Sequence, residues 1–201
     1  MRSELIDALL IDVNNPNVMV RLIRIHQYLD GVLSALVNER LIESHYLDVE
    51  RIPFPLRVEL GVAIGVIAND DRSPLLQFNT IRNQFAHDPK RVLTEKDSRD
   101  FYNVCQGKLR YIGHREYDSF ADAEECVTYM SVVLYLKLQQ SLDHIRNSKL
   151  WDRAAAEEMQ ELLDKNPGLR NVIQSKRSET NESIKARFDR LKAEHSEQDK
   201  T

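Results

Sequence analysis

Apolar residues recur every three or four positions along most of this chain, and that spacing constrains the fold more than any other feature. The clearest run is Leu22, Ile25, Leu29, Val32, Leu33 and Leu36. One face of an α-helix presents residues at this spacing, whereas a strand alternates every second residue. No segment shows strand-like alternation, and the six glycines and six prolines fall mostly between the periodic segments. The sequence therefore predicts an all-α fold, a bundle of five or six helices.

Proline and capping residues set several of the expected boundaries. The expected helices begin at Ser3, near Pro16, at Pro55, at Pro74, after Thr94 and after Ser119. Three of these helices are expected to end near Asp12, Glu43 and Asp88. Pro89 enforces the stop near Asp88, because the residue before a proline is pushed out of the α region.

Periodicity also predicts which side chains face the core. For the third helix they are Leu56, Leu60, Ala63, Ile64 and Ile67; for the fifth, Phe101, Val104, Cys105 and Leu109; for the sixth, Ala123, Cys126, Val127, Met130, Leu134, Leu138, Leu142 and Ile145. Gly61 and Gly65 are expected to permit a close helix contact.

Composition excludes several classes of protein. With 42% apolar and 30% charged residues and a net charge of −4, the chain is not a basic protein that coats nucleic acid with its whole surface. Two cysteines on apolar helical positions, Cys105 and Cys126, predict buried thiols and a reducing compartment. No signal peptide, membrane-spanning run or metal-ligand spacing is present, so we expect a cytoplasmic protein without metal or cofactor.

The composition changes after Trp151, which predicts a helical domain over residues 1–150 and a charged helical extension over 151–201. Within the extension, residues 153–168 read as a helix with a glycine stop. The segment 169–194 is rich in charged residues and sparse in apolar ones. It is open whether that segment is a solvated helix, a docking arm or partly disordered.

One stretch, "IRNQFAHDP" at residues 81–89, places polar side chains within an otherwise plain amphipathic helix. Asn83 and His87 are four residues apart and share a face. Arg82 and His87 are five apart, about 140° around the helix, and would not meet on a straight helix. They would act on one substrate only if the arginine wraps the helix, the helix end deforms, or two copies share the site.

These residue types suit metal-free cleavage of a phosphodiester. An arginine can hold a phosphate and balance its charge, and a histidine near neutrality can move protons. The helix C-terminus and Asp88 favour a protonated His87. Lys90 and Arg91 add positive charge for a possible RNA contact. The alternative is structural: in helical projection Arg82 lies between Leu75 and Phe78, close to the apolar side, as an ion-pair partner at the edge of the core.

"RNQFAH" resembles the R-x4-6-H signature of the HEPN superfamily, in the form with a polar residue after the arginine. "PFPLRVELGVAIGVI" followed by "LLQFNTIRNQFAHDP" also resembles the mannitol operon repressor family, which shares the HEPN-like helical fold. The resemblance covers roughly residues 18–145 in pattern and is specific across about Pro53 to Pro89.

The HEPN resemblance implies a homodimeric, metal-independent endoribonuclease of toxin or defence type. Arg82 and His87 would be its catalytic pair and Asn83 its supporting polar residue, with an antitoxin as a separate protein. The mannitol repressor resemblance implies instead a non-enzymatic regulator that binds another protein. A subunit of a larger assembly, docked through the extension, is a third interpretation.

Overall fold

A computed structural model describes residues 2–41, 43–88, 90–106 and 115–165, with short helical pieces at 175–176, 178, 181–182 and 185–187. The helices are α1 (Arg2–Val13), α2 (Val18–Arg40), α3 (Phe54–Ala63), α4 (Asn69–His87), α5 (Glu95–Cys105) and α6 (Ala123–Lys165), with 3₁₀ turns η1 (Ser44–Tyr46), η2 (Val49–Arg51) and η3 (Tyr117–Ser119). No strand occurs in these ranges, so the all-α prediction is confirmed. The expected residue Leu109 and most of the segment 169–194 lie outside the described residues.

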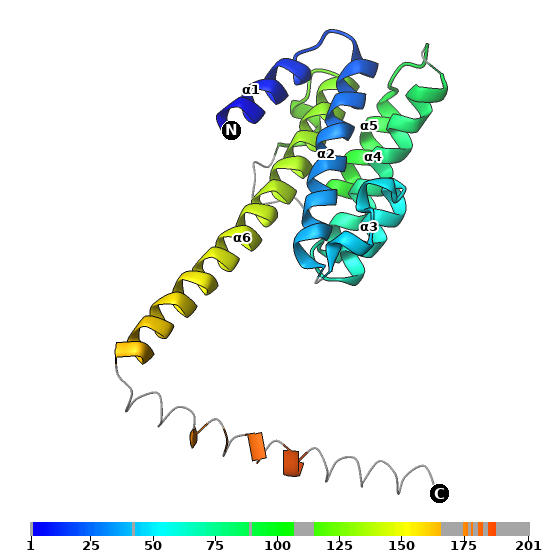
Figure 1. Ribbon diagram of the computed structural model, residues 1–201. Helices are drawn as coiled ribbons and strands as arrows, with labels where there is room; N and C mark the ends of the chain where they lie inside the picture. Colours follow the sequence, from blue (N-terminus) through cyan, green and yellow to red (C-terminus); the bar gives the residue numbers. More distant parts are fainter. Residues whose placement is uncertain are drawn as a thin grey trace, which may run out of the picture. The chain divides into compact units, whose positions relative to one another are not determined.

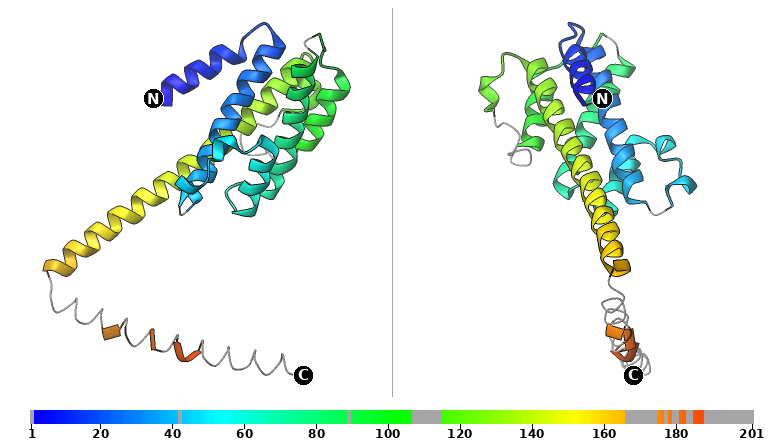
Figure 2. Two further views of the ribbon diagram at one scale, coloured as in Figure 1. Left: turned by 45° about the vertical axis from the view of Figure 1, so that its right-hand side comes forward. Right: turned by 60° about the vertical axis from the view of Figure 1, so that its left-hand side comes forward.

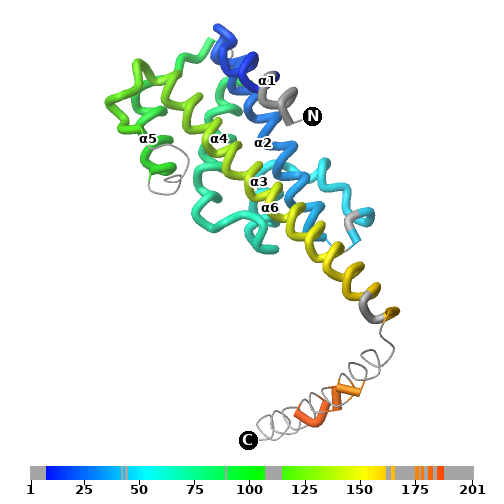
Figure 3. Tube along the Cα trace, turned by 90° about the vertical axis from the view of Figure 1, so that its left-hand side faces the viewer, coloured from blue at the N-terminus to red at the C-terminus, as the bar shows by residue number. Residues whose placement is uncertain are grey.

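The chain divides into two compact units, Met1–Asn147 and Ser148–Thr201. In the first unit, α2 packs against α1, α3 and α4 (Figure 1). The predicted stripe of α2 is buried throughout, because it faces these neighbours. The part of α6 up to Asn147 runs beside α2 (Figures 2 and 3), and an ion pair between Arg21 and Glu124 at 2.6 Å joins the two helices.

α4 begins at Asn69, so the predicted start at Pro74 was wrong. Pro74 lies inside the helix, where it cannot donate to the carbonyl four residues earlier. Long-range contacts hold this first turn: Asp71 is buried and forms an ion pair with Lys137 of α6 at 2.6 Å. The partner is 66 residues away, so no local pattern could have revealed the extra turn.

The inward face of α3 was predicted only in part: Ile67 is buried, and Leu60 and Ile64 pack partly buried against the core, whereas Ala63 is exposed. Leu56 is exposed, whereas Arg57 is almost fully buried. The guanidinium of Arg57 pairs with the carboxylate of Asp30 at 2.6 Å and donates to the backbone carbonyl oxygens of Asp30, Glu50 and Ile52. These four bonds compensate the cost of burying a charge. An arginine can therefore occupy the inward-facing position that apolar periodicity assigned to its neighbour Leu56.

Gly65 marks the end of α3 rather than a contact between helices. Its φ of 73° lies in the left-handed region, which glycine adopts without strain. The amide of Val66 then donates to the carbonyl oxygen of Gly61. The helix therefore stops at Ala63.

The other boundaries follow their local signals with small shifts. α2 begins at Val18, so Pro16 lies before the helix and not in its first turn; Asn17 caps the helix by accepting from the amide of Val20. Thr94 and Asp97 form the predicted capping box of α5. α6 begins at Ala123 rather than next to Ser119.

The predicted core face of α6 is confirmed, since its residues from Cys126 to Leu142 are buried and Ala123 and Ile145 pack partly buried against the core. Cys105 and Cys126 are both buried free thiols, as predicted. Burial raises the pKa of Cys126 to about 11. This thiol is therefore protonated and unreactive at neutral pH.

Candidate functional site

The motif forms the C-terminal part of α4, which ends where the sequence predicts. The last helical residue is His87, and Asp88 leaves the helix with φ −132° and ψ 92°. The amide of Asp88 still donates to the carbonyl oxygen of Gln84 at 3.0 Å. The end of α4 is thus regular, and the expected alternative of a deformed helix end is wrong.

Arg82 is half-buried, as its projection toward the apolar side of α4 suggested. Its Nη1 donates to Oδ1 of Asn83 at 2.9 Å. Its Nε is shielded from solvent and has no hydrogen-bond partner. The adjacent amide therefore fixes the direction of the guanidinium without neutralising its charge.

The lack of a carboxylate partner distinguishes Arg82 from the other described arginines whose Nε is shielded in the same way. Among the described residues, four arginines have an Nε that is shielded and unpartnered, and three of them pair with a carboxylate. Those pairs are Arg21 with Glu124, Arg57 with Asp30 and Arg91 with Asp97, at 2.6, 2.6 and 2.9 Å. Among the residues that the structure describes, no carboxylate lies within ion-pairing distance of Arg82. A half-buried cation without a counter-charge is a suitable place for an external anion.

Two further polar residues, His26 and Asn79, contact each other within the electrostatic influence of Arg82, and the sequence pattern did not single them out. His26 of α2 is buried, and its Nε2 lies 3.1 Å from Oδ1 of Asn79 on α4. Burial lowers the pKa of His26; the hydrogen bond with Asn79 opposes this shift, and the positive charge of Arg82 adds to it. His26 is therefore neutral at pH 7 and leaves Arg82 as the cation of this cluster.

A helical projection could have indicated Asn79, because it precedes Asn83 by four residues and shares its face. His26 gave no such signal. It follows Ile25 in the apolar stripe of α2, and its contact with α4 depends on how the two helices pack. Its ring also lies 4.5 Å from that of Phe54.

His87 is exposed on the last turn of α4. In the ranges that the structure covers, its imidazole has no hydrogen-bond partner. Asn83 shares its face and bonds to Arg82, but among the described residues it makes no bond to His87. The structure thus brings Arg82 and Asn83 together and keeps His87 apart, as expected for residues five apart on a straight helix.

The residues after the helix have different surroundings. Oδ1 of Asp88 accepts from the amide of Lys90 at 3.1 Å and so stabilises the turn. The guanidinium of Arg91 contacts both carboxylate oxygens of Asp97, at 2.9 and 3.0 Å. Lys90 is exposed, which leaves it as the better placed of the two cations for a phosphate.

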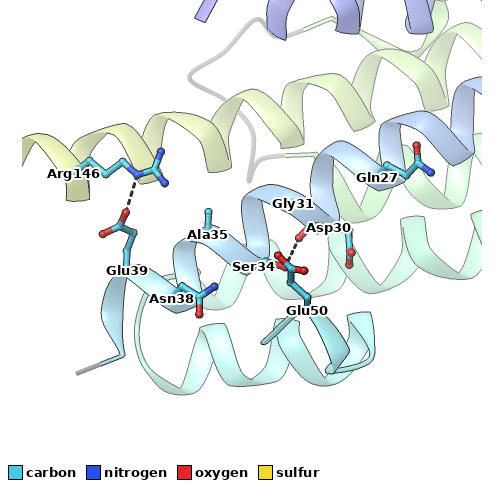
Figure 4. A pocket seen from close by; sticks show the side chains of 9 residues that line it. All are labelled: Gln27, Asp30, Gly31, Ser34, Ala35, Asn38, Glu39, Glu50 and Arg146. Atoms are coloured by element: carbon cyan, nitrogen blue, oxygen red, sulfur yellow. Dashed lines mark hydrogen bonds and ion pairs between the residues drawn. The ribbon is translucent and has the colours of Figure 1, made fainter. Parts of the chain in front are cut away.

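A cavity of about 790 Å³ lies elsewhere, along α2 (Figure 4). Its lining includes Gly31 and Ser34 from α2 and Arg146 from α6, which bonds to Glu39 at 2.8 Å. Neither Arg82 nor His87 lines it. The motif is therefore a surface site at the tip of α4 and not part of this cavity.

Neither a cluster of metal-ligand side chains nor a membrane-spanning helix occurs among the described residues. These residues contain no group of three or more His, Cys, Asp or Glu side chains arranged to hold a metal ion. None of their helices has the length and apolar character needed to cross a membrane. No protein-family model, curated protein or solved structure matches this chain.

Proposed function

We propose that this protein is a cytoplasmic, metal-independent endoribonuclease of the HEPN type, in which Arg82 binds the scissile phosphate and His87 transfers protons. The observation that carries the proposal is the half-buried guanidinium of Arg82, which bonds to an amide where the comparable arginines bond to a carboxylate. A structural ion pair, the alternative role for this arginine, has no acidic partner among the described residues.

The proposed reaction uses the ribose 2′-hydroxyl of RNA as nucleophile. Its oxygen bonds to phosphorus while the bond from phosphorus to the 5′-oxygen of the next nucleotide breaks. The products are a 2′,3′-cyclic phosphate and a 5′-hydroxyl. Arg82 balances the charge on the phosphate oxygens, and His87 delivers a proton to the leaving oxygen or removes one from the 2′-hydroxyl. Asn83 keeps the guanidinium oriented.

The geometry of α4 favours a site made by two copies of the chain. Arg82 and His87 lie on different faces of a regular helix, about 140° apart. Two α4 tips facing each other would place the arginine of one copy near the histidine of the other. The proposal is therefore a homodimer with a shared polar groove, to which Lys90 adds positive charge.

Cleavage of RNA in EDTA tests the activity. The full-length chain should cleave, and Arg82→Ala and His87→Ala should each reduce the rate at least ~100-fold, as loss of a proton-transfer or charge-stabilising group does. Arg153→Ala and His144→Ala change exposed residues of the same types on α6 and should leave the rate unchanged. Folded variants at Arg82 and His87 that cleave as fast as the wild type would refute the proposal.

Mixing the two inactive variants tests the shared site. If the residues act across two copies, a mixture of Arg82→Ala and His87→Ala chains regains part of the activity, because mixed dimers contain one intact site. If each copy works alone, the mixture stays inactive.

A second candidate is a non-enzymatic regulator that binds another protein, as the mannitol operon repressor resemblance suggests. The observation favouring it is that the part of α6 beyond Asn147 exposes large apolar side chains, including Trp151 and Met159. An antitoxin or a regulatory protein on a separate chain would be such a partner. Partner binding and nuclease activity are compatible.

A further inference from the structure

The part of α6 that belongs to the second unit, from Ser148 to Lys165, has an apolar stripe that none of the described residues covers. Every side chain described from Trp151 to Glu161 is exposed. The exposed fraction is 77% for Trp151 and 51% for Met159. A contiguous exposed apolar surface with polar residues at its rim is typical of a binding site for another protein.

The stripe is narrow and continuous. Successive residues of an α-helix are about 100° apart, so Trp151, Ala155 and Met159 lie within a wedge of about 80°. The small Ala155 in the middle leaves space between the two large side chains. A stripe of this kind accepts the apolar face of another helix, with side chains of the partner entering around Ala155.

Charges on this part of α6 are distributed unevenly between the two sides of the helix. Exposed ion pairs Arg153–Glu157 and Lys165–Glu161 join four of the charged residues, at 2.9 and 2.5 Å. Asp152 and Glu158 take part in no ion pair within the described residues. They lie about 60° to either side of Ala155, so the two unpaired carboxylates are the ones that flank the stripe.

From this arrangement we propose that the stripe Trp151–Ala155–Met159 binds a basic amphipathic helix of a partner protein, with Lys or Arg on each flank of its apolar face. The partner's cations would lie opposite Asp152 and Glu158. A second copy of the same stripe fits worse, because pairing would gather four carboxylates at one interface. The inference goes beyond the proposed nuclease activity and does not depend on it.

Trp151 is the only tryptophan of the chain, so its fluorescence reports directly on the stripe. The probes are two 18-residue amphipathic peptides of Leu with Lys and of Leu with Glu, titrated into the full-length protein. The Lys peptide should shift the Trp151 emission to shorter wavelength in a saturable way, because the indole leaves water. The Glu peptide should bind at least ~10-fold more weakly, because its charges repel the flanking carboxylates.

A charge-reversed variant and its matched control locate the effect. Asp152→Lys with Glu158→Lys should reverse the preference, so that the Glu peptide binds more tightly. Glu157→Lys with Glu161→Lys makes the same change in net charge on the other side of the helix and should keep the wild-type preference. Circular dichroism confirms that both variants remain helical.

Three results would overturn the proposal. One is equal response to both peptides, and another is a preference that both double variants change alike. The third is a shift of the Trp151 emission with protein concentration alone, which would identify a second copy as the occupant. The RNA cleavage rate of the variants is a separate measurement, so failure here leaves the nuclease proposal untouched.

Discussion

The side chains of Arg57 and Arg82 are both shielded from solvent in the first unit, but their bonding partners favour different roles. Arg57 is almost fully buried and bonds to one carboxylate and three backbone carbonyl oxygens, of Asp30, Glu50 and Ile52. Arg82 is half-buried and bonds to one neutral amide. The first arrangement holds the fold together, and the second leaves a positive charge available to a ligand.

This contrast predicts different effects on stability. Arg57→Met should lower the free energy of unfolding by about 3–5 kcal/mol, because Asp30 loses its ion-pair partner and buried carbonyl oxygens lose their donors. Arg82→Gln should change it by less than about 1 kcal/mol, since no carboxylate depends on it. Urea unfolding of both variants measures the difference. Similar large losses would mean that Arg82 is structural.

The buried imidazole of His26 predicts a dependence of stability on pH. Its pKa in the folded protein lies below the ordinary value of 6.5, with burial as the main cause. Below pH 6.5 the unfolded chain therefore binds a proton that the folded chain does not, and stability falls as pH falls toward the folded pKa. The contribution is fully present above pH 6.5 and cannot exceed about 1.4 kcal/mol per pH unit.

His26→Gln isolates this contribution, because glutamine can bond to Asn79 but does not titrate. Urea unfolding at pH 7.5, 6.5 and 5.5 should show a steeper loss for the wild type than for the variant. Parallel losses would show that His26 binds its proton equally well in both states.

At the residue scale, the sequence predicted which way the side chain of Arg82 faces, but not which side chains surround it. The helical projection placed it near the apolar side, and it is half-buried. Whether a carboxylate lies near Arg82 depends on side chains from other helices. The spacing of residues along α4 gives no information about those side chains. His26 and Asn79 are 53 residues apart, so only the packing of α2 on α4 reveals their contact.

At the scale of elements, the sequence predicted a helix end correctly where the residues that determine it lie within one turn of that end. The capping box at Thr94 and the stop before Pro89 depend on residues within one turn, and both are seen. The start of α4 and the inward face of α3 depend on the distant partners Lys137 and Asp30. Apolar periodicity assigns burial by residue type, so it could not place a buried arginine.

Two glycines in helices predict opposite effects of the same substitution. Gly31 lies exposed in the middle of α2, and a Cβ added there meets nothing within 4 Å. Gly31→Ala should therefore stabilise the protein by about 0.5–1 kcal/mol. At Gly61 in α3 an added Cβ would collide with the buried side chain of Ile67, so Gly61→Ala should destabilise by about 1–3 kcal/mol.

Urea unfolding of both alanine variants checks the pair. A destabilised Gly31→Ala variant would contradict the open surroundings of this position. Such a result would indicate that another group packs against that face of α2 in solution.

For the whole molecule, the sequence was sufficient to predict an all-α bundle, because helical spacing of apolar residues recurs along the chain. It could not predict how α2, α4 and α6 pack, since many packings bury the same stripes. That packing determines which arginines have acidic neighbours. The sequence also does not predict how two copies of the chain would pair. The proposed site needs two copies because Arg82 and His87 face different directions on one helix.

The central claim is that Arg82 is an anion-binding residue. The most direct test is the affinity of the full-length protein for a short 2′-O-methyl RNA, which can bind but lacks the free nucleophile. Arg82→Gln should weaken binding at least ~10-fold and lower the salt dependence by about one phosphate contact, with unchanged stability. Unchanged affinity in a variant of reduced stability would contradict the claim and assign Arg82 to the fold.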